Sequence, residues 1–358
     1  MKKQWISGMM AGLMSFGLCT AAIPLPKAEA DAGILAGVLG GAIVGTMYRD
    51  QVMGYYKQYN NTEKGRQAWF QQMKKEEGVD TNPALNARLD RIMTNVEKGI
   101  YAVDNTVYNK PYQYFISPKD EANAYCTIGH NVNVFRGIFN TMANDDELAV
   151  ILGHELGHGQ KDHPIKGVKS ALNAQTVAIM ANAATGGNLS GLIGQMYTIT
   201  QNVHLTKPME WEADNLSFDY ITHTYYNPGA TAAVWQRFLD KYGNSTGRWS
   251  DHPTHMQRRD NYVKKLYAWS NKHVNNKDGV IYVNGKEFMT PSAAGGMSSK
   301  ERSYFVMGNL CAVYHKNAKA PDAYASGNVV MMGQQPIIQC VGSDGNASDL
   351  AARLNQIK

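Results

Sequence analysis

The sequence has no strong excess of charge of either sign. Its 35 basic and 30 acidic residues give a formal net charge of +5. Residues 1–30 hold three lysines and one glutamate, so without them 32 basic and 29 acidic residues leave +3. Neither value favours nucleic-acid binding, which usually requires a markedly basic domain. The 44% hydrophobic content over 358 residues excludes a disordered or fibrous chain, and the length predicts one main domain with an appendage of about 80 residues.

Cysteine is scarce, with four residues in the chain. Cys19 falls in the leader described below, so three remain in the rest of the sequence. In an oxidising compartment Cys311 and Cys340 are the natural pair because both lie in the C-terminal part, and we expect a disulfide between them. Cys126 would then be a buried free thiol. An envelope that does not oxidise thiols would leave all three reduced.

The apolar segment from Ala32 to Met47 is too short to span a membrane comfortably. It has 16 residues, whereas a transmembrane helix needs ~20. Four glycines recur in it at every fourth position and would form a flat stripe on a helix, which lets another helix approach closely. We expect membrane association or self-association through this stripe, with a flexible Gly/Ala linker as the alternative. The four are Gly33, Gly37, Gly41 and Gly45.

Residues 1–30 have the features of an export signal. A basic start at Lys2 and Lys3 is followed by an apolar run and by the small-x-small cleavage pattern of residues 28–30. We therefore expect a mature chain from Asp31, exported to the periplasm or cell envelope. An uncleaved signal anchored in the inner membrane and lipidation at Cys19 are the alternatives.

The periodicity of the remaining sequence predicts a mainly helical α+β protein. Residues 49–100 have the apolar spacing of amphipathic helices, and alternation between residues 112 and 139 predicts a short antiparallel sheet. Asn144 can cap the next helix while Glu147 reaches back to it, and Gly159 is expected to end that helix. Two further helices, joined across residues 185–188, should follow. We assign residues 31–48 to the glycine-rich segment and 49–274 to the main domain.

The last part of the chain, residues 275–358, is expected to form a small separate α+β domain. Asn284-Gly285 predicts a hairpin turn within residues 280–288. Later strands are expected near Tyr304 and Val329, and a closing helix from about Ser348. No internal repeat is evident in the sequence.

The segment His154-Glu155-Leu156-Gly157-His158 fits the pattern HExxH. On a helix, residues four apart share one face, so both imidazoles can reach one ion while Glu155 faces the adjacent water. Zinc suits this site because it accepts a fourth ligand readily and acidifies bound water. We expect one Zn²⁺ per chain, with Glu155 as the general base of a hydrolase.

A catalytic zinc site needs a third protein ligand, and residues 208–214 offer one. Pro208 suits the first turn of a helix, and Glu210 and Asp214 are four residues apart on one face. Glu210 is the better ligand candidate, and Asp214 is placed to orient a ligand imidazole. Glu212 points elsewhere and is expected to be solvated. The glycine and histidine of a metzincin motif are absent after His158, so that class is excluded.

These motifs resemble those of the HtpX-like and BepA-like zinc metallopeptidases of peptidase family M48, over roughly residues 80 to 265. The strand block from residue 123 to 137, the HELGH helix and the residues Glu210, Ala213 and Asp214 carry the resemblance. So does His252-Pro253 followed by Arg258, which is similar to the family's HPxxxxR element. A zincin-type fold and a gluzincin-type site are implied.

The resemblance also implies roles for further residues. Glu210 would be the third ligand, and Asp214, His163 and Arg258 would support the ligands. His252 would approach the active site, either to steady the oxyanion or to occupy the open position of zinc in a resting state, unless it is an ordinary loop residue. Ile128 and His130 depart from the Pro and Gly common before the edge strand, which puts the local turn in doubt and could bring His130 near the cleft.

We interpret the sequence as a zinc-dependent endopeptidase of unfolded or misassembled envelope proteins, bound in extended form along an edge strand. An envelope chaperone or assembly scaffold with a weak or regulated protease site is the alternative. The C-terminal 80 residues do not resemble the helical repeats of BepA-like proteins, so the resemblance implies no choice of partner. His204, His223, His255, His273 and His315 lack motif context and are interpreted as ordinary residues.

Overall fold

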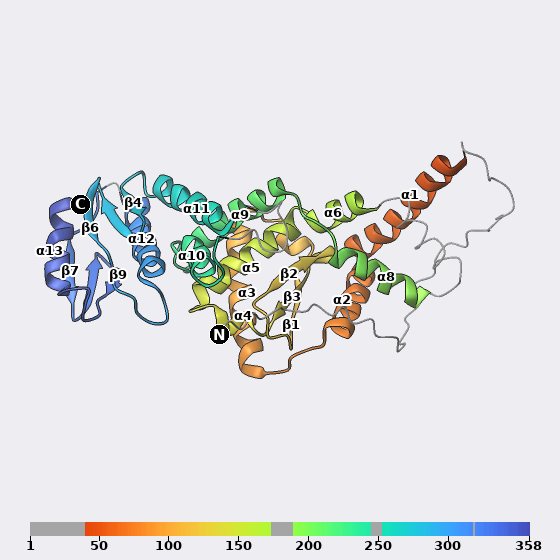
Figure 1. The fold of residues 1–358 in the computed structure, drawn as a ribbon, viewed down its shortest axis with the longest axis horizontal. Helices are drawn as coiled ribbons and strands as arrows, with labels where there is room; N and C mark the ends of the chain where they lie inside the picture. Colours follow the sequence, from red (N-terminus) through yellow and green to blue (C-terminus); the bar gives the residue numbers. More distant parts are fainter. Residues whose placement is uncertain (1–39, 173–188, 245–252, 318) are drawn as a thin grey trace, which may run out of the picture.

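The computed structural model describes residues 40–172, 189–244, 253–317 and 319–358. The described chain is elongated, with helix α1 (Gly40–Asn61) at one end and helix α13 (Ala347–Ile357) at the other (Figure 1). The expected signal peptide, Gly33, Gly37 and His252 lie outside the described residues, whereas Gly41 and Gly45 fall within α1. Among the described helices, none combines the length and apolar character that crossing a bilayer requires.

Residues 49–100 are mostly helical, as the periodicity predicts, and they belong to three α-helices of the described chain. These helices are α1, α2 (Glu63–Glu77) and α3 (Pro83–Val103). The side chain of Asn82 accepts hydrogen bonds from the first backbone N–H groups of α3, and Pro83 occupies its first turn. The buried face of α3 contributes to the main core, while α1 and α2 enclose a second apolar cluster around Trp69, which is fully buried.

The first sheet is mixed rather than antiparallel, which corrects the sequence-based prediction. Its strands are β1 (Gln113–Ser117), β2 (Ala124–Thr127) and β3 (Asn131–Phe135), in the order β1-β3-β2. β2 and β3 form an antiparallel hairpin, and β1 joins the far side of β3 in parallel. Because β3, the strand that follows residue 130, is paired on both sides, the edge strands are β1 and β2.

The turn between β2 and β3 keeps a glycine-like backbone although the sequence departs from the family pattern there. It is the short helix η2 (Ile128–His130), and His130 has a φ of 57°. A non-glycine residue in this region costs roughly 1–2 kcal/mol. The His130 ring stacks on Tyr112 at 4.4 Å and lies 2.7 and 3.0 Å from the carbonyl oxygens of Lys110 and Gly159. These contacts offset the strain.

Helices α5 (Asp145–Gln160) and α9 (Lys207–Thr222) form the centre of the fold. They pack closely because small residues face each other. A Cβ added at Gly153 would lie 3.1 Å from the Ser217 hydroxyl, and one at Gly157 would lie 3.4 Å from the backbone of Ala213. Ser217 also donates a hydrogen bond to the carbonyl of Val150 across the two helices, at 2.8 Å. The spacing between α5 and α9 is therefore fixed.

The cap of α5 is confirmed with two small differences. Asn144 accepts a hydrogen bond from the N–H of Glu147 at 3.0 Å, as predicted. The Glu147 carboxylate, however, accepts from the N–H of Ala143 rather than from Asn144. The helix continues to Gln160, one residue beyond the predicted end.

The remaining elements of the central part surround these two helices (Figure 1). The predicted helices on either side of residues 185–188 are present, while that connection lies outside the described residues. Two more helices, α10 and α11, follow α9 and pack on each other. The bounds are η1 (Val107–Asn109), α4 (Ile138–Thr141), α6 (His163–Ala171), α8 (Leu189–Gln201), α10 (Ala230–Tyr242) and α11 (His255–Trp269).

The C-terminal part consists of two successive units, each with three antiparallel strands and a helix. The sequence showed no repeat, so this repetition is a finding of the structure. Helix α12 packs against β4 and β5 but also against β9, and α13 packs against β7 and β8 but also against β6. The units are β4 (Val274–Lys277), β5 (Val280–Val283), β6 (Lys286–Met289) and α12 (Ser299–Lys316), then β7 (Ala323–Ser326), β8 (Val329–Met332), β9 (Gln335–Gln339) and α13.

Most predictions for this part are confirmed. Asn284 and Gly285, with φ of 51° and 78°, form the tight turn between β5 and β6. Val329 begins a strand, and the closing helix starts at residue 347. Tyr304 is an exception because it lies in α12 and not in a strand. A capping box formed by Ser298 and Glu301 begins that helix and outweighs the β-favouring side chains that follow.

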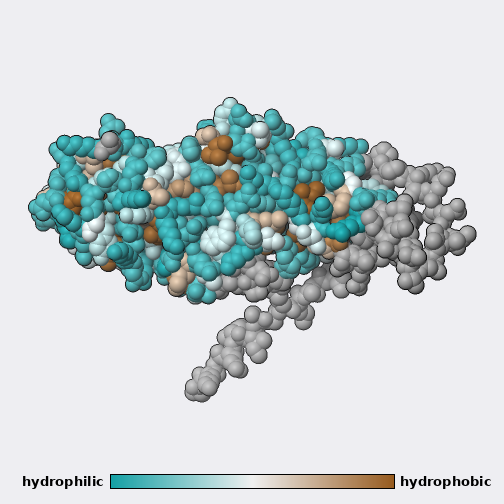
Figure 2. Space-filling model, turned by 90° about the horizontal axis from the view of Figure 1, so that it is seen from above, coloured by the Kyte–Doolittle hydropathy of each residue, from teal (hydrophilic) through white to brown (hydrophobic). Residues whose placement is uncertain are grey.

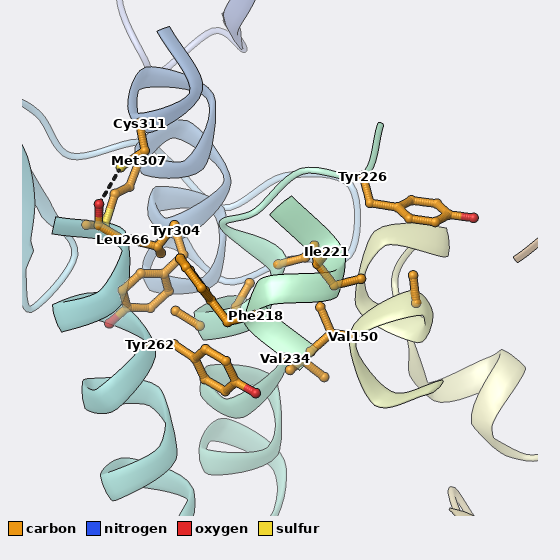
Figure 3. Close-up of a cluster of buried hydrophobic side chains, with 14 of the residues drawn as sticks. Val150, Phe218, Ile221, Tyr226, Val234, Tyr262, Leu266, Tyr304, Met307 and Cys311 are labelled. Atoms are coloured by element: carbon orange, nitrogen blue, oxygen red, sulfur yellow. Dashed lines mark hydrogen bonds between the residues drawn. The ribbon is translucent and has the colours of Figure 1, made fainter. Parts of the chain in front are cut away.

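One hydrophobic core extends from α3 through the central helices into the C-terminal units. Figure 3 shows side chains of α9, α10, α11 and α12 packed together in it. The expected disulfide is not formed: Cys311 and Cys340 are separate buried thiols. Cys311 points toward α11, where its Sγ lies 3.5 Å from the carbonyl oxygen of Leu266, whereas Cys340 follows β9. Sharing the C-terminal part was therefore not sufficient to pair them.

The surface seen in Figure 2 is mainly hydrophilic, with small apolar patches scattered over it. The expected domain boundary near residue 275 coincides with the start of β4 at Val274. Because the core continues across this point, the division into two domains stays a prediction.

Candidate metal centre

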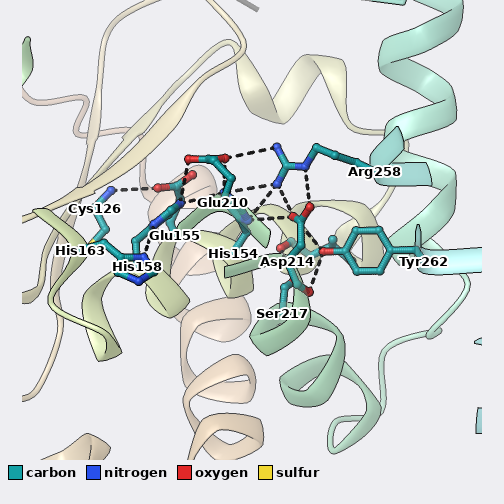
Figure 4. A network of polar contacts seen from close by, with 11 residues as sticks. Cys126, His154, Glu155, His158, His163, Glu210, Asp214, Ser217, Arg258 and Tyr262 are labelled. Carbon is teal, nitrogen blue, oxygen red and sulfur yellow. Dashed lines mark hydrogen bonds and ion pairs between the residues drawn. The ribbon is translucent and has the colours of Figure 1, made fainter. Parts of the chain in front are cut away.

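Three buried side chains from α5 and α9 converge on one point (Figure 4). The Nε2 atoms of His154 and His158 lie 3.0 Å apart. The carboxylate of Glu210 is 3.5 Å from His154 Nε2 and 3.4 Å from His158 Nε2. Ligand atoms about 2.0–2.2 Å from a tetrahedral zinc are separated by about 3.3–3.6 Å, close to these distances. These residues therefore have the donor set and spacing of a three-ligand zinc site.

The local structure explains this convergence. His154 and His158 are one turn apart on the same face of α5, and Glu210 occupies the first turn of α9, whose start is set by Pro208. The glycine-mediated contact between α5 and α9 brings the two faces together. All three side chains are at most 7% exposed, so they would lack solvation without a shared cation.

Glu155 lies beside these ligands and faces the edge strand. Its Oε2 accepts a hydrogen bond from the backbone N–H of Cys126 at 3.1 Å. Burial, reinforced by the charge of Glu210, raises the pKa of Glu155 to about 7, although His154 and the Cys126 N–H oppose the shift. A carboxylate with a pKa near neutrality is suited to accept and return a proton.

His154 is oriented by Asp214, which is itself held by Arg258. Asp214 Oδ1 lies 3.0 Å from Nδ1 of His154, and Arg258 Nε donates to Asp214 Oδ2 at 2.8 Å. Burial raises the pKa of Asp214, but the Arg258 charge and the His154 contact outweigh it, so its pKa lies below the usual value. Burial and Arg258 also lower the pKa of His154, but its carboxylate partners raise it to about 9.

Two aromatic residues complete this arrangement, and neither was predicted from the sequence. The hydroxyl of Tyr262 lies 3.0 Å from the Asp214 carbonyl oxygen and 3.1 Å from its Oδ1. The guanidinium of Arg258 stacks over the Trp235 ring at 3.5 Å. Tyr262 follows Arg258 by four residues on α11, so its position on the same helix face was a usable signal.

His158 is supported differently, through His163. The Nδ1 atoms of these two rings lie 2.9 Å apart, and Nε2 of His163 is 3.1 Å from Oε2 of Glu212. Burial lowers the pKa of both histidines to about 4, so both rings are neutral. Glu212 was expected to be solvated, and it is 47% exposed, but its contact with His163 was missed.

A cavity of about 410 Å³ opens onto the ligands and Glu155. Its walls come from β2, from the start of α6, from α8 and the residues after it, and from the aromatic side of α10. The cavity therefore exposes the backbone of an edge strand next to the ligands. Lining residues include Ala124, Cys126, Pro164, Thr200, Val203, Leu205, Trp235 and Phe238.

The remaining candidate residues from the sequence differ in how close they lie to the ligands. His163 contacts His158, and Arg258 contacts Asp214, while the supporting roles that the resemblance implies for them stay a prediction. His130 is buried against Tyr112 and Gly159 and is not among the residues that line this cavity. His252 lies outside the described residues, so its expected approach to the site stays a prediction.

Comparisons with known proteins agree with this geometry. The sequence profile of peptidase family M48 matches residues 83–265, about half of the chain. Metalloprotease LoiP of Escherichia coli is 26% identical over 171 residues, which cover 47% of this chain and 68% of LoiP. Metalloprotease YcaL of the same organism is 27% identical over 184 residues, covering 50% and 72%. The β-barrel assembly-enhancing protease of E. coli is 20% identical over 229 residues, covering 61% and 44%.

Proposed function

The chain belongs to peptidase family M48, and on that premise we propose that it is a zinc-dependent endopeptidase of unfolded or misassembled cell-envelope proteins. The observation that carries the proposal is the convergence of His154, His158 and Glu210 beside Glu155 in an open cavity. Membership of the family establishes that the chain is of the metalloendopeptidase class. The substrate class and the location in the cell are what we propose.

The residues of the site have distinct roles in peptide hydrolysis. His154, His158 and Glu210 would hold one Zn²⁺ per chain, and the bound ion would supply acidification of the attacking water and polarisation of the peptide carbonyl. The Glu155 carboxylate accepts the proton of that water as the new C–O bond forms. Glu155 then delivers the proton to the amide nitrogen as the C–N bond breaks, so it ends the cycle ionised again.

The edge of β2 is the proposed binding site for the substrate backbone. Cys126 directs its N–H away from β3 and toward Glu155, and neighbouring residues of β2 line the cavity. An extended peptide can pair with such an edge, which leaves its carbonyl beside the ligands. This mode of binding requires a substrate segment without secondary structure of its own, and it therefore favours unfolded proteins.

Three further expectations from the sequence join the proposal. His252, which belongs to the HPxxxxR element with Arg258, is proposed to approach the site and to steady the oxyanion or cap the resting metal. The leader of residues 1–30 and the likeness to a protease named for β-barrel assembly support an exported protein of the periplasm or cell envelope. The glycines between residues 33 and 45 are the proposed point of membrane association or self-association.

The test uses purified residues 31–358 with an unfolded substrate such as reduced casein. The wild-type protein should bind one zinc and cleave the substrate, and a chelator should abolish cleavage until zinc is restored. Glu155→Gln should retain zinc but lose cleavage. A wild-type protein that binds zinc, fails to cleave and still prevents aggregation of the substrate would favour the chaperone alternative.

A further inference from the structure

The two histidine ligands are supported in chemically different ways (Figure 4). His154 meets a carboxylate directly, because Asp214 Oδ1 lies 3.0 Å from its Nδ1. His158 instead meets another imidazole, with Nδ1 of His163 at 2.9 Å. A carboxylate only accepts hydrogen bonds, whereas a neutral imidazole nitrogen accepts or donates according to the tautomer. Support of His158 therefore depends on which nitrogen of His163 carries the proton.

Glu212 fixes that choice. Its Oε2 lies 3.1 Å from Nε2 of His163, and an ionised carboxylate can only accept. Nε2 of His163 must then carry the proton, which leaves its Nδ1 with a lone pair. That lone pair accepts the Nδ1–H of His158, so Nε2 of His158 is left unprotonated and faces Glu210 at 3.4 Å. Each hydrogen bond in the series dictates the next.

We propose that Glu212 and His163 form a hydrogen-bond relay that sets the tautomer and ring orientation of His158 for metal binding. Glu212 is then a positioning residue and not a ligand. The inference rests on the zinc-protease function proposed above, because it concerns the same ligands. Glu212, which the sequence analysis interpreted as a solvated residue, thereby has a role in the site.

The relay differs from the support of His154 in its exposure to solvent. His163 is 1% exposed, but the Glu212 side chain is 47% exposed and also lies 3.8 Å from Lys161 Nζ. Asp214 is fully buried and paired with Arg258. Hydrogen bonds to a buried, paired carboxylate hold a ring more firmly than those to a half-exposed one. His158 is accordingly the ligand whose support is easiest to weaken from outside.

The test compares zinc affinity in the full mature chain, measured by competition with a chromogenic chelator. Glu212→Ala removes the acceptor, and it should weaken zinc binding about 10-fold or more, the usual size of such effects. Glu212→Gln keeps an acceptor oxygen for His163 Nε2–H and should bind more tightly than Glu212→Ala. Lys161→Ala, the matched control, removes the neighbouring charge but no member of the relay, and it should bind zinc like the wild type.

A second measurement reads the tautomer itself. Long-range proton–nitrogen NMR spectra of the zinc-free protein, in which no metal fixes the His158 tautomer, should show His163 protonated at Nε2 in the wild type and in Glu212→Gln. In Glu212→Ala the ring should become a mixture of tautomers. Because Glu212 is half-exposed, the zinc-free variants should unfold thermally at the wild-type temperature, which separates positioning from loss of fold.

The outcomes distinguish the relay from the proposed function. If wild-type protein binds no zinc, the proposed function itself fails. If wild-type protein binds zinc and cleaves, the relay is overturned by any of three results: equal affinity in Glu212→Ala, an equal loss in Lys161→Ala, or a loss in Glu212→Gln as large as that in Glu212→Ala.

Discussion

The backbone N–H of Cys126 donates a hydrogen bond to the Oε2 of Glu155 at 3.1 Å. The strand proposed to pair with the substrate is therefore tied to the residue proposed to move the proton. Since Cys126 lies on β2 and Glu155 on α5, the contact sets the distance between these two elements. It thereby fixes the proposed substrate-binding edge relative to the proposed general base.

Glu155 should control the rate without controlling zinc binding. Glu155→Gln should lower kcat by roughly 10²–10⁴-fold, the usual contribution of a general base. Steady-state assays with a quenched peptide measure the loss, and metal analysis should still find one zinc per chain. A variant that keeps wild-type kcat would show that another group accepts the proton.

The dependence of kcat/KM on pH should reflect the ionisation of Glu155. Burial raises the pKa of Glu155 to about 7, and only its ionised form accepts a proton. Activity should thus rise with pH, with a midpoint no higher than about 7, because a bound cation would lower the pKa. The measurement is kcat/KM between pH 5 and 9. An activity that falls as pH rises through this range would contradict the assignment.

Arg258 should be needed for stability as well as for the site. Arg258→Ala leaves the carboxylate of Asp214, which is 0% exposed, buried without its partner, and the loss should be about 3–5 kcal/mol. Denaturant unfolding of zinc-free protein measures it. The matched control is Arg259→Ala, because Arg259 pairs with the half-exposed Asp260. An equal loss of unfolding free energy in the two variants would mean that the buried ion pair contributes no more to stability than the exposed one.

A buried ionic cluster that joins the central helices to the C-terminal units should make stability pH-dependent. Arg237 forms ion pairs with both Glu147 and Glu301. Its Nε lies 3.1 Å from Oε2 of Glu147. Burial and the nearby Glu147 raise the pKa of Glu301 from 4.5 to about 8. The folded state then binds this proton more tightly than the unfolded state, so the free energy of unfolding should fall as pH rises from about 4.5 to 8.

Glu301→Gln should remove part of that fall, since glutamine can keep the capping role at the start of α12. Thermal unfolding at several pH values between 4.5 and 8 tests it, with the exposed Glu287→Gln as the control. If both variants retain the full wild-type dependence, Glu301 does not titrate as its surroundings imply.

The residues of the candidate metal centre could be predicted from the sequence because each inference used only the spacing of residues along one helix. The i and i+4 positions of His154 and His158, and of Glu210 and Asp214, follow from helix geometry alone. The contact of Glu212 with His163 was missed because it depends on how α6 and α9 approach each other. No local pattern in either segment contains that information.

Errors elsewhere have the same origin. The parallel pairing of β1 with β3 depends on which side of the hairpin β1 joins, and the alternating pattern is identical for both directions. The repeated units of the C-terminal part share the order of their elements but not their residues, so no sequence period reveals them. Tyr304 was misassigned because its neighbours favour strands, whereas the capping signal at residues 298–301 was available and outweighs them.

The crossed packing of the two C-terminal units has a consequence for how this part of the chain must fold. Because α12 covers β9 and α13 covers β6, neither unit can bury its own strands completely. The strands of each unit are fully covered only when the other unit is folded. The two units should therefore fold together in one cooperative event. Loss of α13 would therefore affect not only β7 and β8 but also β6, which precedes it by more than fifty residues.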